Sequence, residues 1–87
     1  MLNTFKFLFA LTVILFTFEL KANSFQDGKN AEKDGNYKAA FDIWLQLSQN
    51  GDASAQTGLA FLYKNGLGVK RDMDQAINWF KEAAAGG

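Results

Sequence analysis

Apolar residues recur at steps of three and four between positions 37 and 84, a spacing that gathers side chains on one face of an α-helix. The spacing predicts helices over residues 37–49 and 53–64, and another that begins after Asp72. A weaker pattern predicts a first helix over residues 25–33. The three expected apolar faces are Tyr37, Ala40, Phe41, Trp44 and Leu47, then Ala55, Leu59, Leu62 and Tyr63, then Met73, Ala76, Ile77, Phe80 and Ala84.

Short polar side chains mark the expected helix starts, because their oxygens can accept from the free backbone N–H groups of a first turn. The predicted N-caps are Ser24 or Asn23, Asn36, Asp52 and Asp72. The last of these has the spacing of a capping box with Gln75. Glycines follow the expected helix ends, where a left-handed residue is favoured. These signals predict an all-α fold of about four helices.

The helices also repeat. Aligning Ala40 with Ala76 brings Trp44 onto Phe80 and Gly51 onto Gly87, a period of 36 residues. Periods of this length are typical of solenoids built from helix-turn-helix hairpins. We therefore expect a partial repeat in residues 23–51 and a full one in residues 52–87.

The second unit carries a detailed pattern. Its positions are Asp52, Ala53, Ala55, Gln56, Leu59, Tyr63, Gly66, Gly68, Val69, Asp72, Ala76, Trp79, Phe80, Ala83 and Ala84. This pattern closely resembles a Sel1-like repeat, a relative of the tetratricopeptide repeat, of a secreted bacterial type. The first unit is more loosely similar to a tetratricopeptide repeat. The resemblance implies a scaffold or adaptor that binds another protein or peptide without chemistry of its own, which is an inference from fold alone.

The first 22 residues differ from the rest. A short polar start with Lys6 precedes an apolar run over residues 7–18, and Glu19 and Lys21 follow it. This arrangement is typical of a secretory signal peptide. An uncleaved membrane anchor is the alternative, although a spanning helix needs about 20 apolar residues.

The expected cleavage lies between Ala22 and Asn23, with a cut after Ser24 as the second choice. Cleavage would release a periplasmic or secreted chain of residues 23–87, which touches a membrane only if the segment is retained. The sequence has no Cys, so no disulfide can stiffen this small unit.

Charge and composition exclude several functions. Nine basic residues balance nine acidic ones, which argues against a nucleic-acid binder. Some cysteine-rich relatives of the Sel1-like family are described as penicillin-binding or weak β-lactamase proteins. This chain has no Cys, no His and no Ser-x-x-Lys motif. We predict no enzyme, no catalytic residue, no cofactor and no metal.

Two local features invite a chemical interpretation. The Gly66-Leu67-Gly68 run could cradle a phosphate, but the dinucleotide motif needs a preceding strand and a longer glycine pattern. A repeat loop is the favoured interpretation. Asp72 and Asp74 could act as an acid–base or metal pair, but two carboxylates in a first helical turn favour a cap and a partner for the helix dipole.

Three aromatic residues could stack on a sugar or a base: Trp44, Trp79 and Phe80. Trp44 and Phe80 are predicted to lie in the core between helices. Trp79 lies beside the apolar face and is predicted to be partly exposed.

Lys29, Glu32 and Lys33 cluster on the first helix. First helices of such hairpins line a concave binding face by analogy with tetratricopeptide repeats, so these side chains could contact a partner. A solvated helix face is the favoured interpretation. An interaction adaptor is the leading hypothesis, and a truncated remnant of a longer repeat protein is the alternative.

Overall fold

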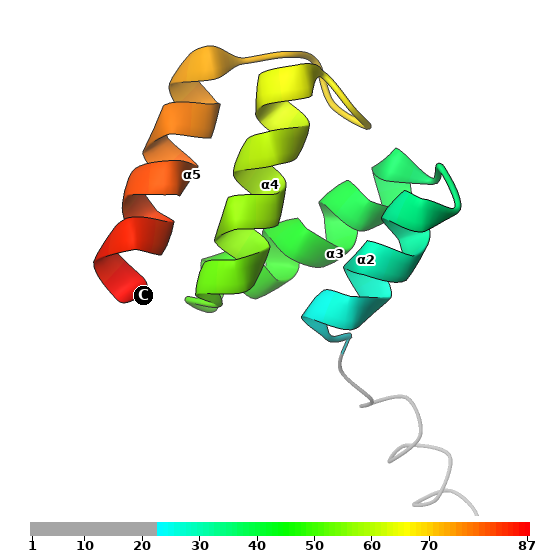
Figure 1. Ribbon diagram of the computed structural model, residues 1–87, viewed down its shortest axis with the longest axis horizontal. Coiled ribbons are helices and arrows are strands. Elements are labelled where there is room, and N and C mark those ends of the chain that lie inside the picture. The colour runs from blue at the N-terminus through cyan, green and yellow to red at the C-terminus, as the bar shows by residue number, and fades with distance from the viewer. Residues whose placement is uncertain (1–22) are drawn as a thin grey trace, which may run out of the picture.

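The computed structural model describes residues 23–87, which form helices joined by short loops and contain no strand. The helices are α2 (Phe25–Lys33), α3 (Tyr37–Gln49), α4 (Ala53–Asn65) and α5 (Met73–Gly86). Figure 1 shows them as two helical hairpins, α2 with α3 and α4 with α5. The predicted all-α fold is confirmed for this part of the chain. The predicted signal segment, residues 1–22, lies outside the described residues.

Each helix begins at a side-chain cap, at the predicted residue. Asn36 accepts from the backbone N–H of Ala39 at 3.2 Å, and Asp52 accepts from that of Ala55 at 3.1 Å. A complete capping box forms at α2, where Ser24 and Asp27 bond reciprocally. At α5 only the forward bond of the predicted box is recorded, from the backbone N–H of Gln75 to the Asp72 side chain at 3.1 Å.

The helices pack in chain order: α3 lies between α2 and α4, and α5 packs chiefly on α4. Two helices are therefore covered on both sides, whereas α5 has a close neighbour on one side within residues 23–87. None of the helices in this range is long and apolar enough to cross a bilayer.

Trp44 of α3 is the centre of the fold and is 1% exposed. Its ring stacks on Phe25 of α2, with centroids 5.5 Å apart, and its Nε1–H donates to the Phe25 carbonyl at 3.2 Å. Gly28 of α2 and Gly58 of α4 lie against its two sides. A Cβ on Gly58 would lie 2.7 Å from Trp44 Cε3, and a Cβ on Gly28 would also collide with the indole. One side chain thus joins three helices, and its predicted place in the core is confirmed.

The rest of the core is small. Its other fully buried apolar residues are Ala40, Ala55, Leu59, Ala60, Leu62 and Ala76. At its edge, Phe41 of α3 meets Tyr63 of α4 edge to face, with ring centroids 5.5 Å apart. Four of the six residues are alanines, so the helices approach closely and a few large side chains fill the space that remains.

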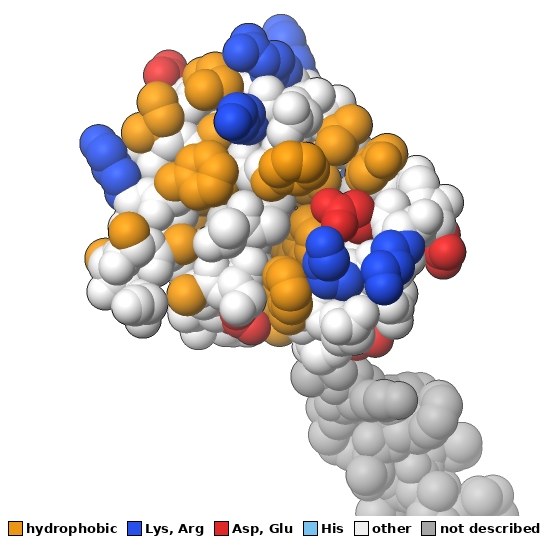
Figure 2. Space-filling view, in the orientation of Figure 1, with side chains coloured by type: hydrophobic (Ala, Val, Ile, Leu, Met, Phe, Trp, Pro, Cys, Tyr) orange, Lys and Arg blue, Asp and Glu red, His pale blue; other side chains and the backbone are white. Residues whose placement is uncertain are grey.

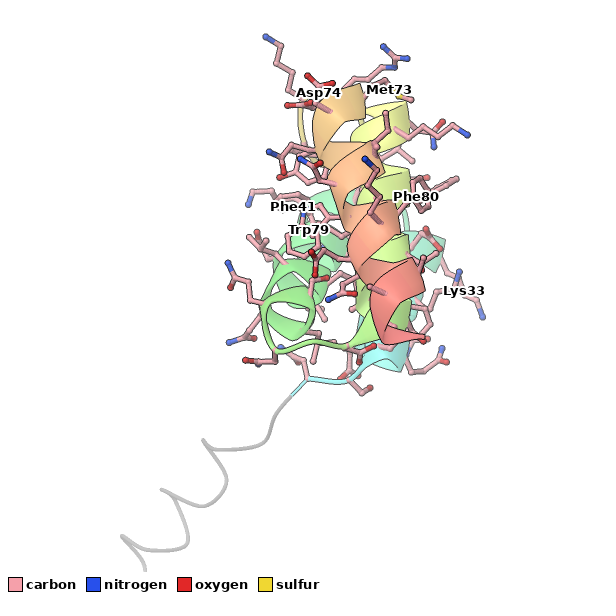
Figure 3. The ribbon with its side chains drawn as sticks, turned by 90° about the vertical axis from the view of Figure 1, so that its left-hand side faces the viewer. Lys33, Phe41, Met73, Asp74, Trp79 and Phe80 are labelled. Carbon is pink, nitrogen blue, oxygen red and sulfur yellow. The ribbon has the colours of Figure 1, made fainter. Side chains whose placement is uncertain are left out.

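The predicted core position of Phe80 is wrong, because this side chain is 40% exposed. Met73 and Ile77, on the same expected face, are 37% and 45% exposed. The helix instead turns Ala76 and Trp79 toward the interior, and Trp79 is half-buried against the core, as expected. Figure 3 shows Met73 and Phe80 on one side of α5 and Trp79 on the other. No described helix covers the Met73–Phe80 side.

The loop between α4 and α5 fixes one hairpin on the other. Gly66 ends α4 in the left-handed conformation, with φ of 66°. Gly68, with φ of 71°, lies directly against the backbone carbonyl of Tyr37 at the start of α3, where a Cβ would not fit. Leu67 and Val69 pack against the core. The glycine run therefore serves as a repeat loop that docks on the first hairpin.

Candidate interaction surfaces

An open groove of about 310 Å³ runs between α2 and α4, the first helices of the two hairpins. Phe61 stands on its α4 side with 46% of its surface exposed. Figure 2 shows hydrophobic side chains gathered over α4 and α5 on this face, with basic side chains over α2. The groove is lined by Phe25, Lys29, Glu32, Trp44, Ser54, Thr57, Gly58 and Phe61.

Two of the three charged residues considered as possible partner contacts on the first helix line this groove. Lys29 Nζ lies 2.8 Å from Glu32 Oε1, and the side chains are 40% and 19% exposed. Lys33 is exposed in the last turn of α2 and does not line the groove. The structure thus brings Lys29 and Glu32 together as an ion pair at the edge of an apolar groove.

The exposed apolar side of α5 forms a second surface, which we call the α5 stripe: Met73, Ile77 and Phe80. Together with Phe61 these are the large hydrophobic residues that stay exposed in the described part of the chain. Single exposed apolar residues are ordinary, but a contiguous set on a small protein marks an interaction surface.

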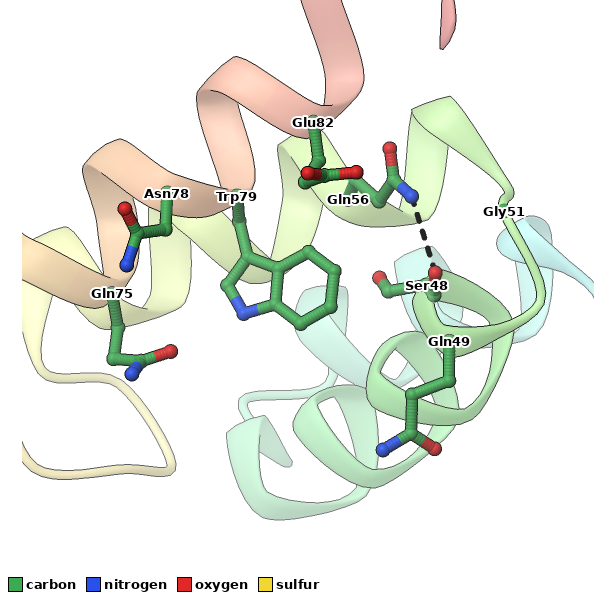
Figure 4. A pocket seen from close by; sticks show the side chains of 8 residues that line it. All are labelled: Ser48, Gln49, Gly51, Gln56, Gln75, Asn78, Trp79 and Glu82. Atoms are coloured by element: carbon green, nitrogen blue, oxygen red, sulfur yellow. Dashed lines mark hydrogen bonds between the residues drawn. The ribbon is translucent and has the colours of Figure 1, made fainter. Parts of the chain in front are cut away.

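A third surface lies on the other side of α5, where α3, α4 and α5 border an open pocket of about 430 Å³ (Figure 4). We call it the amide pocket because four carboxamide side chains border it. It shares no lining residue with the α2–α4 groove. Its lining residues are Ser48, Gln49, Gly51, Gln56, Gln75, Asn78, Trp79 and Glu82.

Two polar atoms in the amide pocket are buried without a hydrogen-bond partner. Ser48 is 3% exposed and Gln56 is 5% exposed. Gln56 Nε2 donates to the Ser48 carbonyl at 3.1 Å, drawn as a dashed line in Figure 4, which ties α4 to the end of α3. Ser48 Oγ and Gln56 Oε1 have no partner among the described residues. Buried polar atoms are rarely left unpaired in proteins.

Of the two carboxylates at the start of α5, Asp72 has the predicted role of a cap. Asp74 is an exposed residue of the first turn of this helix. Within residues 23–87, no three His, Cys, Asp or Glu side chains lie close enough together to hold a metal ion.

Sequence reasoning missed three residues of these surfaces: Phe61, Ser48 and Gln56. Ser48 lies four residues after Trp44, which itself lies four after Ala40, so all three share one helical face. A hydroxyl on this apolar face was the sequence feature that could have indicated a buried polar residue. Gln56 likewise lies one turn before Leu59 on the buried side of α4, so a carboxamide on a buried line was its signal. Phe61 had no comparable signal.

The comparison with family models supports the resemblance of the second hairpin. Residues 53–87 match the Sel1 repeat family model, a segment that covers α4, the glycine loop and α5. No solved structure is a significant match to the chain. Sel1 repeats are generally non-catalytic modules for protein–protein interaction. The second hairpin is thus similar to an interaction repeat, and the first completes its core.

Proposed function

We propose that this chain is an exported, non-catalytic adaptor or scaffold that binds another protein or peptide. The α2–α4 groove and the α5 stripe are the binding surface. One observation carries the proposal: Phe61, Met73, Ile77 and Phe80 remain 37–46% exposed on a unit that has few large side chains in its core. The similarity of residues 53–87 to an interaction repeat supports it.

The surface has the features of an interaction site. Aromatic and large aliphatic side chains provide most of the binding energy at protein interfaces when a partner removes them from water. Charged groups at the rim of such a patch add orientation and specificity more than affinity. The Lys29–Glu32 pair has this position beside Phe61 in the groove. An amphipathic helix or an extended apolar peptide is the partner that fits best.

The export part of the proposal depends on residues 1–22, whose pattern is that of a signal peptide. We propose cleavage between Ala22 and Asn23 and a periplasmic or secreted product. The intact mass of the protein from each cell fraction tests this. A soluble product with the mass of residues 23–87 supports export, and a membrane-bound product that retains residues 1–22 contradicts cleavage.

Two alternatives predict different measurements. A remnant without an independent role should melt without cooperativity, which circular dichroism would detect. An enzyme like the cysteine-rich β-lactamase relatives should hydrolyse a β-lactam above background. Neither alternative has an observation in its favour.

Position-specific crosslinking in the producing cells tests the adaptor. A photoreactive amino acid at Phe61 or Ile77 should form a discrete adduct with one protein, whereas the same amino acid at Gln46, exposed on α3, should not. The purified partner should then bind Phe61→Ser at least tenfold more weakly, while the thermal melt stays unchanged. Equal adducts at Gln46 and Phe61, or unchanged affinity, would contradict the proposal.

A further inference from the structure

Two buried polar atoms of the amide pocket, Ser48 Oγ and Gln56 Oε1, have no hydrogen-bond partner among the described residues. The Ser48 carbonyl can only accept, so the nitrogen of the Gln56 carboxamide must face it, as the 3.1 Å bond records. That bond leaves Gln56 Oε1 as an acceptor that needs a donor. Ser48 Oγ, the other atom without a partner, can donate and accept. A ligand that satisfies both atoms must bring a donor to Gln56 Oε1 and a donor or an acceptor to Ser48 Oγ, and hydroxyl groups can supply both.

The other residues that line the amide pocket indicate a ligand that forms many hydrogen bonds and carries no negative charge. Gln49, Gln75 and Asn78 each offer a donor and an acceptor, and all three are exposed enough to meet a ligand. Glu82 is the charged side chain of the lining, and its carboxylate accepts from hydroxyl groups and repels anions. No cation lines the pocket to hold a phosphate or a carboxylate.

Trp79 supplies a flat apolar surface within this polar ring. Figure 4 shows its indole in the pocket, between Gln75 and Asn78 of α5 and the Ser48–Gln56 pair. The ring is half-buried, so part of it remains available to a ligand. An aromatic face among carboxamides suits a molecule with an apolar C–H face and a hydroxyl edge. The pocket, at about 430 Å³, falls in the size range of small-molecule sites, roughly 300–1,000 Å³.

We propose that the amide pocket binds a neutral saccharide unit. One face of the sugar ring lies on Trp79, and sugar hydroxyls reach Ser48 Oγ and Gln56 Oε1 when these two buried side chains turn toward the pocket. The carboxamides and Glu82 bind the remaining hydroxyls. This site is separate from the peptide-binding surface proposed above, since the two share no lining residue. Either proposal can fail without the other.

The two tryptophans make the test specific. The protein, expressed from the full 87-residue sequence with ¹⁵N label and recovered as the host processes it, should show one indole N–H signal from each tryptophan. Titration with maltotriose, cellotriose and tri-N-acetylchitotriose should shift the Trp79 signal with at least one sugar, with millimolar affinity. The Trp44 signal should stay in place, because this residue is 1% exposed and its N–H is bonded to Phe25.

Ser48→Ala separates ligand binding from a structural role. Removal of an unpaired buried hydroxyl should raise the melting temperature of the free protein. The same change should weaken the sugar roughly three- to tenfold, the loss expected for one hydrogen bond. Ser54→Ala, an exposed serine that lines the other groove, should change neither the affinity nor the Trp79 shift.

Glu82→Gln tests whether the negative charge of the pocket contributes to the affinity for a neutral sugar. A neutral sugar should keep its affinity within about threefold, because the amide oxygen still accepts a hydrogen bond. Three results would overturn the proposal. The first is no Trp79 shift with any of the sugars, which would mean a hydrated groove only. The others are a shift with a neutral tripeptide such as Gly-Ser-Gly but with no sugar, and a sugar affinity that is unchanged in Ser48→Ala.

Discussion

Trp44 and Phe80 occupy equivalent positions of the two hairpins, 36 residues apart, and have opposite environments. Trp44 is 1% exposed and Phe80 is 40% exposed. The helix of Trp44 lies between two others, and the helix of Phe80 packs chiefly on one. The repeat places both aromatic residues on the same side of their helices, but only a covered helix buries that side.

The difference in burial between Trp44 and Phe80 shows that the same repeat position can serve the core or the surface. Around Trp44, Gly28 of the first hairpin and Gly58 of the second leave room for the indole, so this large side chain fills the junction of three helices. On α5, Ala76 makes the buried contact with α4, and the residues of the α5 stripe remain exposed. The covered side of α3 therefore contributes its aromatic residue to the core, whereas the outer side of α5 leaves its apolar residues exposed.

Trp44→Ala should have the largest effect. Truncation of a fully buried aromatic residue costs about 3–5 kcal/mol. A unit of 65 residues has a total stability of about 3–10 kcal/mol at the usual value per residue. We expect this variant to lose its cooperative transition in a thermal melt followed by far-ultraviolet circular dichroism. A cooperative melt within a few degrees of the parent would contradict the central role of Trp44.

Substitutions of the glycines around Trp44 should have the second-largest effect on stability. Gly28→Ala or Gly58→Ala inserts a methyl group against the indole, and overpacking of this kind costs about 1–3 kcal/mol. Gly86→Ala is the matched control, because no atom outside its own helix lies within 4 Å of the added carbon. Urea unfolding should show a lower midpoint than the parent for Gly28→Ala and Gly58→Ala. The midpoint of Gly86→Ala should not fall. Equal midpoints would mean that the indole can move aside.

The helix starts and the central tryptophan were predictable from sequence because they depend on local or strongly periodic signals. Ser24, Asn36, Asp52 and Asp72 cap their helices through bonds to residues three positions away. Periodicity also placed Trp44 correctly, since its helix has neighbours on two sides. Local spacing contains this information whether or not the tertiary packing is known.

The exposure of Phe80 and the amide pocket were not predictable in the same way. Periodicity groups the apolar residues of α5 on one broad face, but it cannot say which edge of that face meets α4. Alanines allow a close approach, so Ala76 rather than Phe80 occupies the contact. The pocket joins Ser48, Gln56 and Trp79 from three helices, and its shape depends on how those helices cross. The glycine loop, in contrast, is predictable as a repeat feature from its spacing, although its contact with Tyr37 is not.

Removal of a helix cap should have an intermediate effect that differs between the hairpins. Asp52→Ala and Asp72→Ala each remove one side-chain cap, which costs about 1 kcal/mol. We expect Asp52→Ala to lower the global stability, because α4 packs on both α3 and α5. Asp72→Ala should mainly speed hydrogen exchange in the first turns of α5. Faster exchange throughout all four helices in Asp72→Ala would show that α5 does not open independently.

Phe80→Ser should have the smallest effect on stability, and Phe41→Ser provides the matched control. Phenylalanine and serine have similar helix propensities, so the change in unfolding free energy reports mainly the loss of burial. Phe41 contacts Tyr63 edge to face and packs against the core, so its loss should cost about 2–4 kcal/mol. Phe80→Ser should stay within about 1 kcal/mol of the parent, because 40% of the side chain is already in water. Urea unfolding measures both values, and crosslinking to the partner should fall for Phe80→Ser although its stability hardly changes. If the two serine variants were equally destabilised, the α5 stripe would be part of the core. Its apolar character would then be explained by packing and not by binding to a partner.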